Sequence, residues 1–559
     1  MKKLSLDYVR KEIIGNYSVI ETPYGERNLF YADYTASGRN LKFIEDKLLN
    51  IEKSYANTHT TDDYTGKYLT NILHQSEEMI KKYVNAGENY KIISTGSGST
   101  GALKKLQEIM GVYIPPATRD RIYTSIKSLG CKDCSVLEKI NIDKPVVFIG
   151  PYEHHTNELM WREAFAELVV IELGDDGLIN LRDFRDKISD SKYRNRIKIC
   201  SFSAGSNITG IVSDSYEIAR IAHKHNAYAF FDFAAIAPYV KVDIEKDKDN
   251  YFDAIFFSPH KFLGGPGSAG VLIFHQKLYR NDLPPTTAGG GTVDYVGYFQ
   301  QDYSSDIETR EKAGTPPILQ TIKTALAMET KEKIGIDTIE EVEDENKNIF
   351  FSSILNNDKI EIIGNRDPKN RIPIISFNIK HEDRYLHPRL VTRLLSDLFG
   401  IQSRAGCSCA GPYGHRLLHI DIKTSDKYRK KIVQGITGVK PGWVRINLHF
   451  VFTKKDIDFL IKAINFISDY GDKFLFQYKF NINTSEWTNI NYTEKSRSLN
   501  VLKKYELKDI EQKDIEKFRK KYFVEAEKLA KTLKKPEKKD YVKDKADIED
   551  LKYFYHCVE

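Results

Sequence analysis

Lys261 and Asp232 could do chemistry because each stands at the end of an apolar run. Asp232 closes the run YAFFD, and Lys261 follows the next run, DAIFFS, with glycines soon after it. A lysine at a strand end is ordinarily a solvated boundary residue, and an aspartate there ordinarily caps a helix or starts a turn. A desolvated lysine, however, can lose its proton and attack a carbonyl carbon. A carboxylate beside it could keep an aromatic nitrogen protonated, so the pair predicts a site for an aldehyde with a ring nitrogen.

A glycine-rich junction, STGSGSTGAL at residues 94–103, could bind a phosphate of the same molecule. It lies between a predicted strand and a predicted helix, where backbone N–H groups and the helix dipole favour an anion. The glycine spacing also fits a dinucleotide site, but the acidic residue expected about 20 positions later has no clean strand before it. A structural turn is the other alternative. Pyridoxal 5'-phosphate combines aldehyde, ring nitrogen and phosphate, so we expect it as the cofactor.

Two features of the C-terminal half could act on a substrate. The loop RAGCSCAGPYG holds Cys407 and Cys409 among small residues that are poorly placed for core packing. Arg404, at the start of this loop, could favour a thiolate. Arg445 interrupts the apolar run GWVRINLHF, as a surface residue or a bidentate clamp on a carboxylate would.

The pattern of elements explains how these residues could meet. From about residue 90 to 275, apolar strands alternate with small-residue loops and amphipathic helices, which predicts a mostly parallel α/β sheet with ligands at the carboxyl ends of its strands. A helical stretch and a smaller α+β unit follow. We expect these parts: an N-terminal segment at 1–27 packing on the small domain, a large cofactor-binding α/β domain at 28–314, a connecting helix at 315–355, a small α+β domain with the cysteine loop at 356–490, and a charged helical extension at 491–559.

Composition argues against several classes of protein. The 559 residues include 84 basic and 78 acidic side chains, so no large positive field indicates a nucleic-acid partner. The N-terminus lacks the apolar stretch of a secretion signal, and no run approaches the roughly 18 apolar residues of a membrane span. Six cysteines in so long a chain do not make a disulfide framework, so we expect reduced thiols and a cytoplasmic protein. No metal site is expected, because Cys131 and Cys134 have only speculative histidine partners.

Taken together, these residues resemble the class V aminotransferase-fold enzymes that use pyridoxal phosphate, and most closely the cysteine desulfurase and selenocysteine lyase branch. The resemblance covers roughly residues 28–480. It implies fold type I, with a large, mostly parallel seven-stranded sheet domain and a smaller α+β domain. The motifs that carry it are YADYTASGR, STGSGSTGA, EHHTN, SNITGIV, FDFAAIAPYVKVD, SPHKFLGGPG, KAGTPP and RAGCSCAGP.

The resemblance implies the cofactor residues one by one. Lys261 matches the lysine that forms a Schiff base with the cofactor, and Asp232 matches the partner of the pyridine nitrogen. His154 matches the histidine that stacks on the ring, and Asn207 the asparagine near its phenolic oxygen. The positions that match phosphate-binding residues are Ser99, Thr100, Ser258, His260 and, from the neighbouring subunit of a homodimer, Thr315.

The substrate residues follow in the same way. Cys409 matches the cysteine that forms a persulfide, in a motif that begins with Arg404. Arg445 matches the arginine that binds the substrate carboxylate, and Arg404 and Ala36 are expected as further substrate-binding residues. The implied reaction converts L-cysteine or selenocysteine to L-alanine and leaves the sulfur on Cys409, from which a sulfur-acceptor protein would take it.

Two departures from the family pattern keep alternatives open. Desulfurases usually carry a glutamine three residues after the pyridine-binding aspartate, where this chain has Ala235, and Cys407 is an extra thiol near the presumed nucleophile. A lyase, epimerase or aminotransferase reaction on another amino acid, with Cys409 not catalytic, is therefore the first alternative. A non-catalytic scaffold is the second. The exact substrate, the sulfur acceptor and the role of the C-terminal extension are not readable from the sequence.

Overall fold

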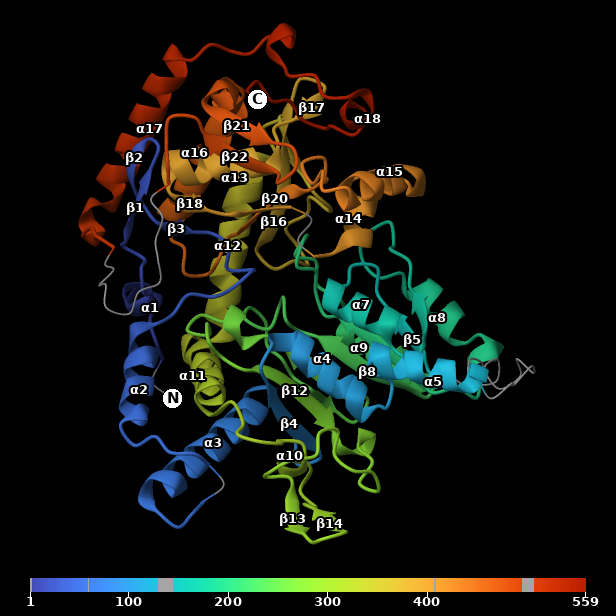
Figure 1. The fold of residues 1–559 in the computed structure, drawn as a ribbon. Coiled ribbons are helices and arrows are strands. Elements are labelled where there is room, and N and C mark those ends of the chain that lie inside the picture. Colours follow the sequence, from blue (N-terminus) through green and yellow to red (C-terminus); the bar gives the residue numbers. More distant parts are fainter. Residues whose placement is uncertain (1–2, 59, 129–143, 407–408, 495–506, 559) are drawn as a thin grey trace. The chain divides into compact units, whose positions relative to one another are not determined.

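The protein was analysed as a computed structural model that describes residues 3–58, 60–128, 144–406, 409–494 and 507–558. Two compact units are present (Figure 1). Unit 1 comprises residues 1–5, 37–207 and 211–337, and unit 2 comprises residues 6–36, 208–210 and 338–559. Cys131, Cys134 and Cys407 lie outside the described residues. Within the described part of the chain, no helix is long and apolar enough to cross a membrane.

Unit 1 is built on a seven-stranded sheet whose strand order is β4-β12-β11-β8-β7-β5-β6. Strand β12 runs antiparallel to both of its neighbours, and the remaining pairs are parallel. The predicted seven-stranded, mostly parallel sheet is thus confirmed. In this order the strands are β4 (Tyr90–Thr95), β12 (Gly270–His275), β11 (Ala254–Phe257), β8 (Ala227–Asp232), β7 (Lys198–Ser203), β5 (Val146–Ile149) and β6 (Glu167–Val170).

Helices of unit 1 follow the strands as the alternating pattern predicts. They are α2 (Lys42–Glu52), α3 (Tyr64–Tyr83), α4 (Gly98–Ile109), α5 (Pro116–Ser128), α7 (His155–Glu163), α8 (Leu181–Ile188), α9 (Ser215–Lys224), α10 (Ile307–Arg310) and α11 (Ile318–Ile334). The short strands β9 (Glu245–Asp247), β10 (Asn250–Tyr251), β13 (Val293–Val296) and β14 (Gln301–Tyr303) form two hairpins.

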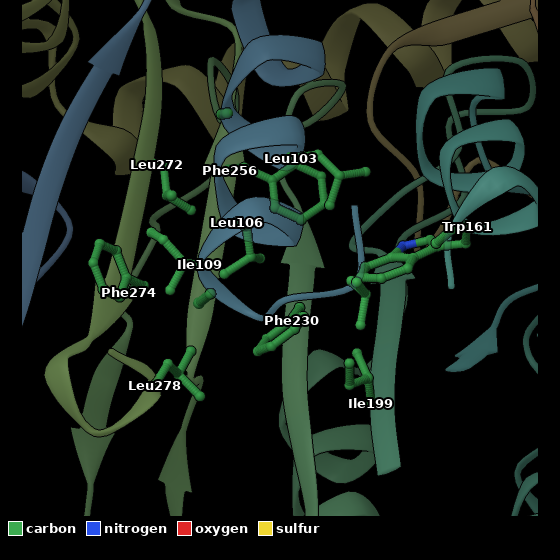
Figure 2. Packing of buried hydrophobic residues seen from close by; sticks show 14 of the residues in the cluster. Leu103, Leu106, Ile109, Trp161, Ile199, Phe230, Phe256, Leu272, Phe274 and Leu278 are labelled. Carbon is green, nitrogen blue, oxygen red and sulfur yellow. The ribbon is translucent and has the colours of Figure 1, made fainter. Parts of the chain in front are cut away.

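The core of unit 1 lies between helix α4 and the sheet. Leu103 and Leu106 of α4 pack in one buried cluster with Phe230 and Phe256 of neighbouring strands, and Trp161 of α7 extends the cluster (Figure 2). Strand β7 is buried at every position, as expected for a central strand with both faces covered. This packing fixes the glycine-rich start of α4 against the strand ends.

Unit 2 has a smaller sheet in the order β15-β16-β20-β19, with β17 paired to β16. Its strands are β15 (Ile360–Ile362), β16 (Ile374–His381), β17 (Arg384–Tyr385), β19 (Arg404–Gly406) and β20 (Trp443–Asn447), with outlying pairs formed by β1 (Val19–Thr22), β2 (Gly25–Asn28), β3 (Phe30–Tyr31), β18 (Ile401–Gln402), β21 (Tyr478–Asn481) and β22 (Glu486–Asn489). Its helices are α1 (Leu6–Glu12), α12 (Ile336–Ile354), α13 (Pro388–Phe399), α14 (Gly411–Leu417), α15 (Ile422–Val433), α16 (Lys454–Tyr470), α17 (Ile515–Thr532) and α18 (Ala546–Glu549).

The segment that the sequence predicts as one connecting helix contains two helices, α11 and α12. Gly335 separates them with a φ of 93°, a conformation that residues with a Cβ rarely adopt. A single helical periodicity on both sides of this glycine hides the break from a sequence reading.

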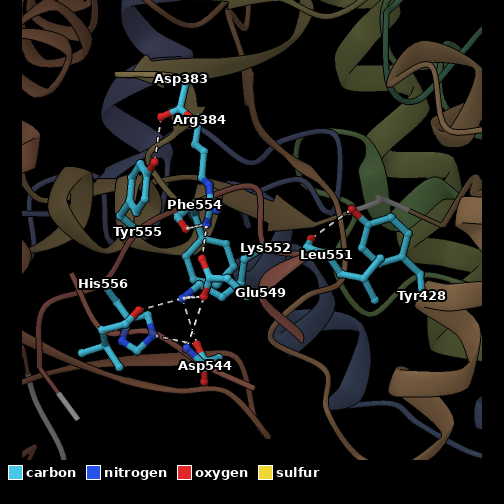
Figure 3. Close-up of polar contacts among 11 residues, drawn as sticks. Asp383, Arg384, Tyr428, Asp544, Glu549, Leu551, Lys552, Phe554, Tyr555 and His556 are labelled. Carbon is cyan, nitrogen blue, oxygen red and sulfur yellow. Dashed lines mark hydrogen bonds and ion pairs between the residues drawn. The ribbon is translucent and has the colours of Figure 1, made fainter. Parts of the chain in front are cut away.

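The C-terminal segment is an integral part of unit 2. Helix α17 contacts α13, α16 and β2, and Tyr522 accepts a hydrogen bond from the backbone N–H of Asn28. Near the end of the chain, Lys552 has a fully buried side chain that pairs with Asp544 and Glu549 (Figure 3). A backbone hydrogen bond from Tyr385 to Tyr553 also ties this end to β17. The extension is therefore packed on unit 2 both through α17 and through the end of the chain.

Replacing Leu106 with alanine tests the core of unit 1. Leu106 is fully buried, so Leu106→Ala should leave a cavity and lower the free energy of unfolding by about 2–5 kcal/mol. Leu159 of α7 is 46% exposed, so Leu159→Ala is the matched control and should change stability by less than about 0.5 kcal/mol. Urea denaturation measures both variants, and equal losses would contradict the packing described.

Candidate functional site

The carboxyl ends of β8 and β11 bring the two reactive residues of unit 1 to one edge of the sheet. The strands are parallel neighbours, and Asp232 at the end of β8 pairs in register with Phe256 of β11. After β11, Ser258 leads into a single 3₁₀ turn, Pro259–Lys261, which ends with Lys261. Both residues therefore follow the carboxyl ends of parallel strands, at the edge where α/β sheets bind ligands.

Asp232 is a buried carboxyl group, with only 4% of the residue exposed. Its Oδ1 accepts a hydrogen bond of 2.8 Å from the backbone N–H of Ala234. Burial raises its pKa to about 6, while this hydrogen bond and the charge of Lys261 act in the opposite direction. The lysine is thus close enough to influence the carboxylate, which is suited to hold a cationic group.

The start of α4 and Ser258 form a cradle of hydrogen-bond donors. The backbone N–H of Ser99 donates to Ser258 Oγ over 2.8 Å, and the two hydroxyl groups lie 3.2 Å apart. Gly98 has a φ of 58°, and a Cβ added there would lie only 2.8 Å from Ser258 Oγ. Thr100 is exposed, and its hydroxyl group lies 2.8 Å from that of Thr156. Glycine is therefore required here, and the hydroxyl groups and helix start suit a phosphate.

Two of the predicted cofactor residues are histidines, His154 and His260, and both take part in local hydrogen bonds. His154 precedes α7, and its Nδ1 accepts a hydrogen bond of 3.1 Å from the backbone N–H of Thr156. Burial and the charge of Lys261 lower the pKa of His260 to about 4, so its ring is neutral at neutral pH. The carbonyl of His260 accepts hydrogen bonds from the backbone of Gly38 and the hydroxyl of Ser37.

Glu153 is a buried residue of this region to which the sequence reading gave no role. Its carboxylate accepts four hydrogen bonds, from the backbone N–H groups of Gly150 and Ser203, the Ser203 hydroxyl and the Asn157 amide. Burial raises its pKa to about 7, and the charge of Asp232 adds to this effect. In the sequence, the only indication that Glu153 belongs to the site was its place in the EHHTN motif. Asn207, predicted near the cofactor, is also buried.

Thr315 lies in an exposed turn before α11. Its Oγ1 accepts a hydrogen bond of 3.2 Å from the side-chain amide of Asn57. The predicted role of Thr315 toward a neighbouring subunit stays a prediction.

Unit 2 brings together the two predicted arginines and a third residue, Asp33. Arg445 lies in β20 directly opposite Arg404 in β19. Asp33 Oδ1 lies 3.1 Å from Arg445 Nη2, and Oδ2 lies 2.9 Å from Arg404 Nε. The Arg445 side chain is buried, and Arg404 is half exposed. In the sequence, the only signal for Asp33 was its place in the YADYTASGR motif. Ala36 of the same motif donates a backbone hydrogen bond to the carbonyl of Asp33.

Cys409 is exposed and lies just before helix α14. Its φ is 58°, a left-handed conformation that costs a non-glycine residue about 1 kcal/mol or more. Among the described residues, no group of three or more side chains could hold a metal ion.

Asp232→Asn should stabilise the cofactor-free protein at pH 8. The pKa of a free aspartate, 3.8, lies below the folded value of about 6, so folding disfavours the ionised form by about 3 kcal/mol above pH 6. This cost fades as the pH falls through 6 toward 4, and the gain from the amide should shrink with it. Urea denaturation at pH 8 and pH 5 measures the difference.

The matched control is Asp282→Asn, because that exposed carboxylate pairs with Arg280, which lowers its pKa to about 2. This substitution should give no stabilisation at either pH. An Asp232→Asn variant that is no more stable than the parent at pH 8 would contradict the buried charge.

Comparison with known proteins gives a family and relatives. The sequence model of the aminotransferase class-V family matches residues 136–460, more than half of the chain. A protein named probable cysteine desulfurase from Halalkalibacterium halodurans is 26% identical over 464 residues, which are 82% of this chain and 98% of the relative. A Staphylococcus aureus (strain Mu50) protein of the same name is 27% identical over 475 residues, 84% of this chain and 98% of its own length.

Solved structures agree on the fold. An apo cysteine desulfurase from Thermococcus onnurineus superposes with a TM-score of 0.64 at 21% identity, covering 84% of this chain and 100% of that one. A cysteine desulfurase from Escherichia coli gives 0.59 at 18% identity, with coverages of 83% and 98%. The predicted family and fold are confirmed: the chain is an enzyme of the class-V aminotransferase family.

Proposed function

We propose that the chain is a pyridoxal phosphate-dependent cysteine desulfurase, which converts L-cysteine to L-alanine and takes the sulfur onto Cys409. The observation that supports the proposal is the presence in unit 1 of a buried carboxyl group, Asp232, at the end of β8, within electrostatic reach of Lys261 in the turn that follows the parallel neighbour β11. The match to relatives named probable cysteine desulfurase over most of their length supports the choice of reaction.

The residues present fit pyridoxal phosphate. Asp232, buried with little compensating charge, suits a protonated ring nitrogen. The cradle at Ser99 and Ser258, where a Cβ at Gly98 would collide, suits a phosphate. Lys261 would carry the cofactor aldehyde, and His154, Asn207, Thr100 and His260 would complete the site. When bound, this cofactor supplies an electron sink that makes the α-proton of an amino acid acidic.

The site residues then have distinct roles in the proposed reaction. Lys261 accepts the α-proton of the substrate, and Asp232 keeps the ring nitrogen protonated. Arg445 binds the substrate carboxylate, with Arg404 beside it. Sulfur of Cys409, as the thiolate, forms an S–S bond with the substrate sulfur while the substrate's C–S bond breaks. Protonation of the remaining three-carbon fragment gives alanine, and the persulfide stays on Cys409.

Partners follow from the same proposal. A reductant or a protein thiol must accept the persulfide sulfur, and we propose a sulfur-acceptor protein. A homodimer is proposed in which Thr315 reaches the phosphate of the neighbouring subunit's cofactor. The reduced thiol that the reaction needs suits a cytoplasmic location.

One residue favours an alternative reaction. Ala235 is buried and offers no side-chain donor where desulfurases usually carry a glutamine. Without that amide, the hydrogen bonding around the ring differs from the usual pattern. A class V reaction on another amino acid, with Cys409 uninvolved, is therefore the second candidate. Selenocysteine instead of cysteine remains within the proposed function.

Cys409→Ala should lower sulfide and alanine formation from L-cysteine at least about 100-fold, because the thiolate is the proposed nucleophile. Purified enzyme with pyridoxal phosphate, L-cysteine and a reductant would be assayed for both products. The visible spectrum should still change when L-cysteine is added, since cofactor and substrate binding do not need this thiol.

Cys557→Ala is the matched control, because Cys557 is another described thiol and is only partly exposed. It should keep the parent rate. Full sulfur release by Cys409→Ala would reject the persulfide scheme and favour the alternative reaction. A protein that takes up no pyridoxal phosphate at all would instead support the scaffold.

A further inference from the structure

The segment around Asp33 is clamped by backbone hydrogen bonds on two sides. The N–H of Ala32 donates to the carbonyl of Gln402, two residues before Arg404, over 2.9 Å. On the other side, the N–H of Asn447, two residues after Arg445, donates to the carbonyl of Ala32 over 2.9 Å. Strand β20, which carries Arg445, and strand β18, which ends two residues before Arg404, are thus both tied to the residue next to Asp33. Backbone hydrogen bonds of the neighbouring residue Ala32 therefore fix the position of Asp33.

Ring contacts and a strand pairing also hold the segment around Asp33. The ring of Tyr34 stacks on His449 with centroids 3.9 Å apart, and Tyr31 contacts Tyr34 edge-on. Strand β3 pairs in parallel with β18, so Phe30 lies opposite Ile401. Asp33 itself is only 8% exposed. A carboxylate held so firmly is pre-organised toward whatever it contacts.

Asp33 contacts two positively charged side chains, Arg404 and Arg445. Arg404 and Arg445 are direct cross-strand partners, and like charges in that arrangement repel each other. Asp33 gives one carboxylate oxygen to each guanidinium group. The three side chains then sum to a single positive charge. One α-carboxylate of a substrate would complete the balance.

We propose that Asp33 is a positioning residue, which holds the guanidinium groups of Arg445 and Arg404 in place to bind the substrate carboxylate. The inference rests on the proposed function for the identity of the substrate, but the geometry it invokes belongs to unit 2 alone. Without the charge of Asp33 the repulsion between the two arginines is no longer offset by this carboxylate, and the buried Arg445 loses its ion pair with it. The arginines then move apart, and the carboxylate site loses its shape.

The test compares Asp33→Asn with the parent enzyme loaded with pyridoxal phosphate. Loss of orientation should lower kcat/KM for L-cysteine about tenfold or more, mainly through KM. Half-saturation of the spectral change with L-alanine, which has the same carboxylate but no sulfur, should rise by a similar factor. Unchanged or tighter binding in Asp33→Asn would overturn the proposal.

A double-mutant cycle separates positioning from mere structural support. In an Arg404→Ala/Arg445→Ala background, Asp33→Asn should change kcat/KM by less than about twofold, because both residues that it acts through are gone. A full additional loss in that background would overturn the proposal. Asp397→Asn is the matched control: Asp397 is buried in the same unit and pairs with Arg393, so its loss should lower stability and leave KM unchanged.

A crystal structure of Asp33→Asn makes the test independent of the reaction. The guanidinium groups of Arg404 and Arg445 should be displaced from their positions in the parent. If both groups keep their positions, the proposal is wrong whatever the enzyme's substrate. If they move but the parent enzyme releases no sulfur from L-cysteine, the proposed function fails and the role of Asp33 stands.

Discussion

The burial of the Asp232 carboxyl group, within electrostatic reach of Lys261, is the constraint that the rest of unit 1 must support. A buried carboxylate is costly, and here the compensating charge is incomplete, since the pKa of Asp232 stays raised to about 6. The sheet can hold such a group because the core between α4 and the strands is extensive and tightly packed. The same core fixes the start of α4, where Gly98 and Ser99 meet Ser258.

In unit 2 the charges that need compensation are positive. They are two guanidinium groups, one buried and one half exposed, on neighbouring strands of the small sheet. The register of β19 and β20 places Arg404 opposite Arg445, an arrangement that is unfavourable unless an anion joins it. Asp33 supplies that anion from a segment distant in sequence. Both units therefore hold at least one buried charged group, Asp232 or Arg445, whose neighbours compensate its charge only in part, as is common in sites that bind charged ligands.

The sequence allowed the sheet, Asp232 and Lys261 to be predicted, because apolar runs that end in polar residues are a local signal. Glu153 and Asp33 were not recognised, since their importance depends on donors and cations brought together by tertiary structure. The break at Gly335 was missed because helical periodicity continues on both sides. Roles of single residues, such as Thr315 or Cys409, rest on family resemblance, because no local pattern states what a side chain will meet.

Glu153 and Asp232 together explain why a cationic ring would be held firmly in unit 1. Both are buried carboxyl groups with raised pKa values, and the charge of Asp232 contributes to the raised pKa of Glu153. Glu153 is satisfied by four hydrogen-bond donors, whereas Asp232 receives one from Ala234 in the described part of the chain. The donors around Glu153 lower its pKa, but burial raises it more, so near pH 7 Glu153 is only partly ionised and adds a partial negative charge to the field around Asp232. That field disfavours a second negative charge and favours a cation, and a protonated pyridine nitrogen is such a cation. The electrostatic demand of the protein thus matches the cofactor that the strand-end residues predict.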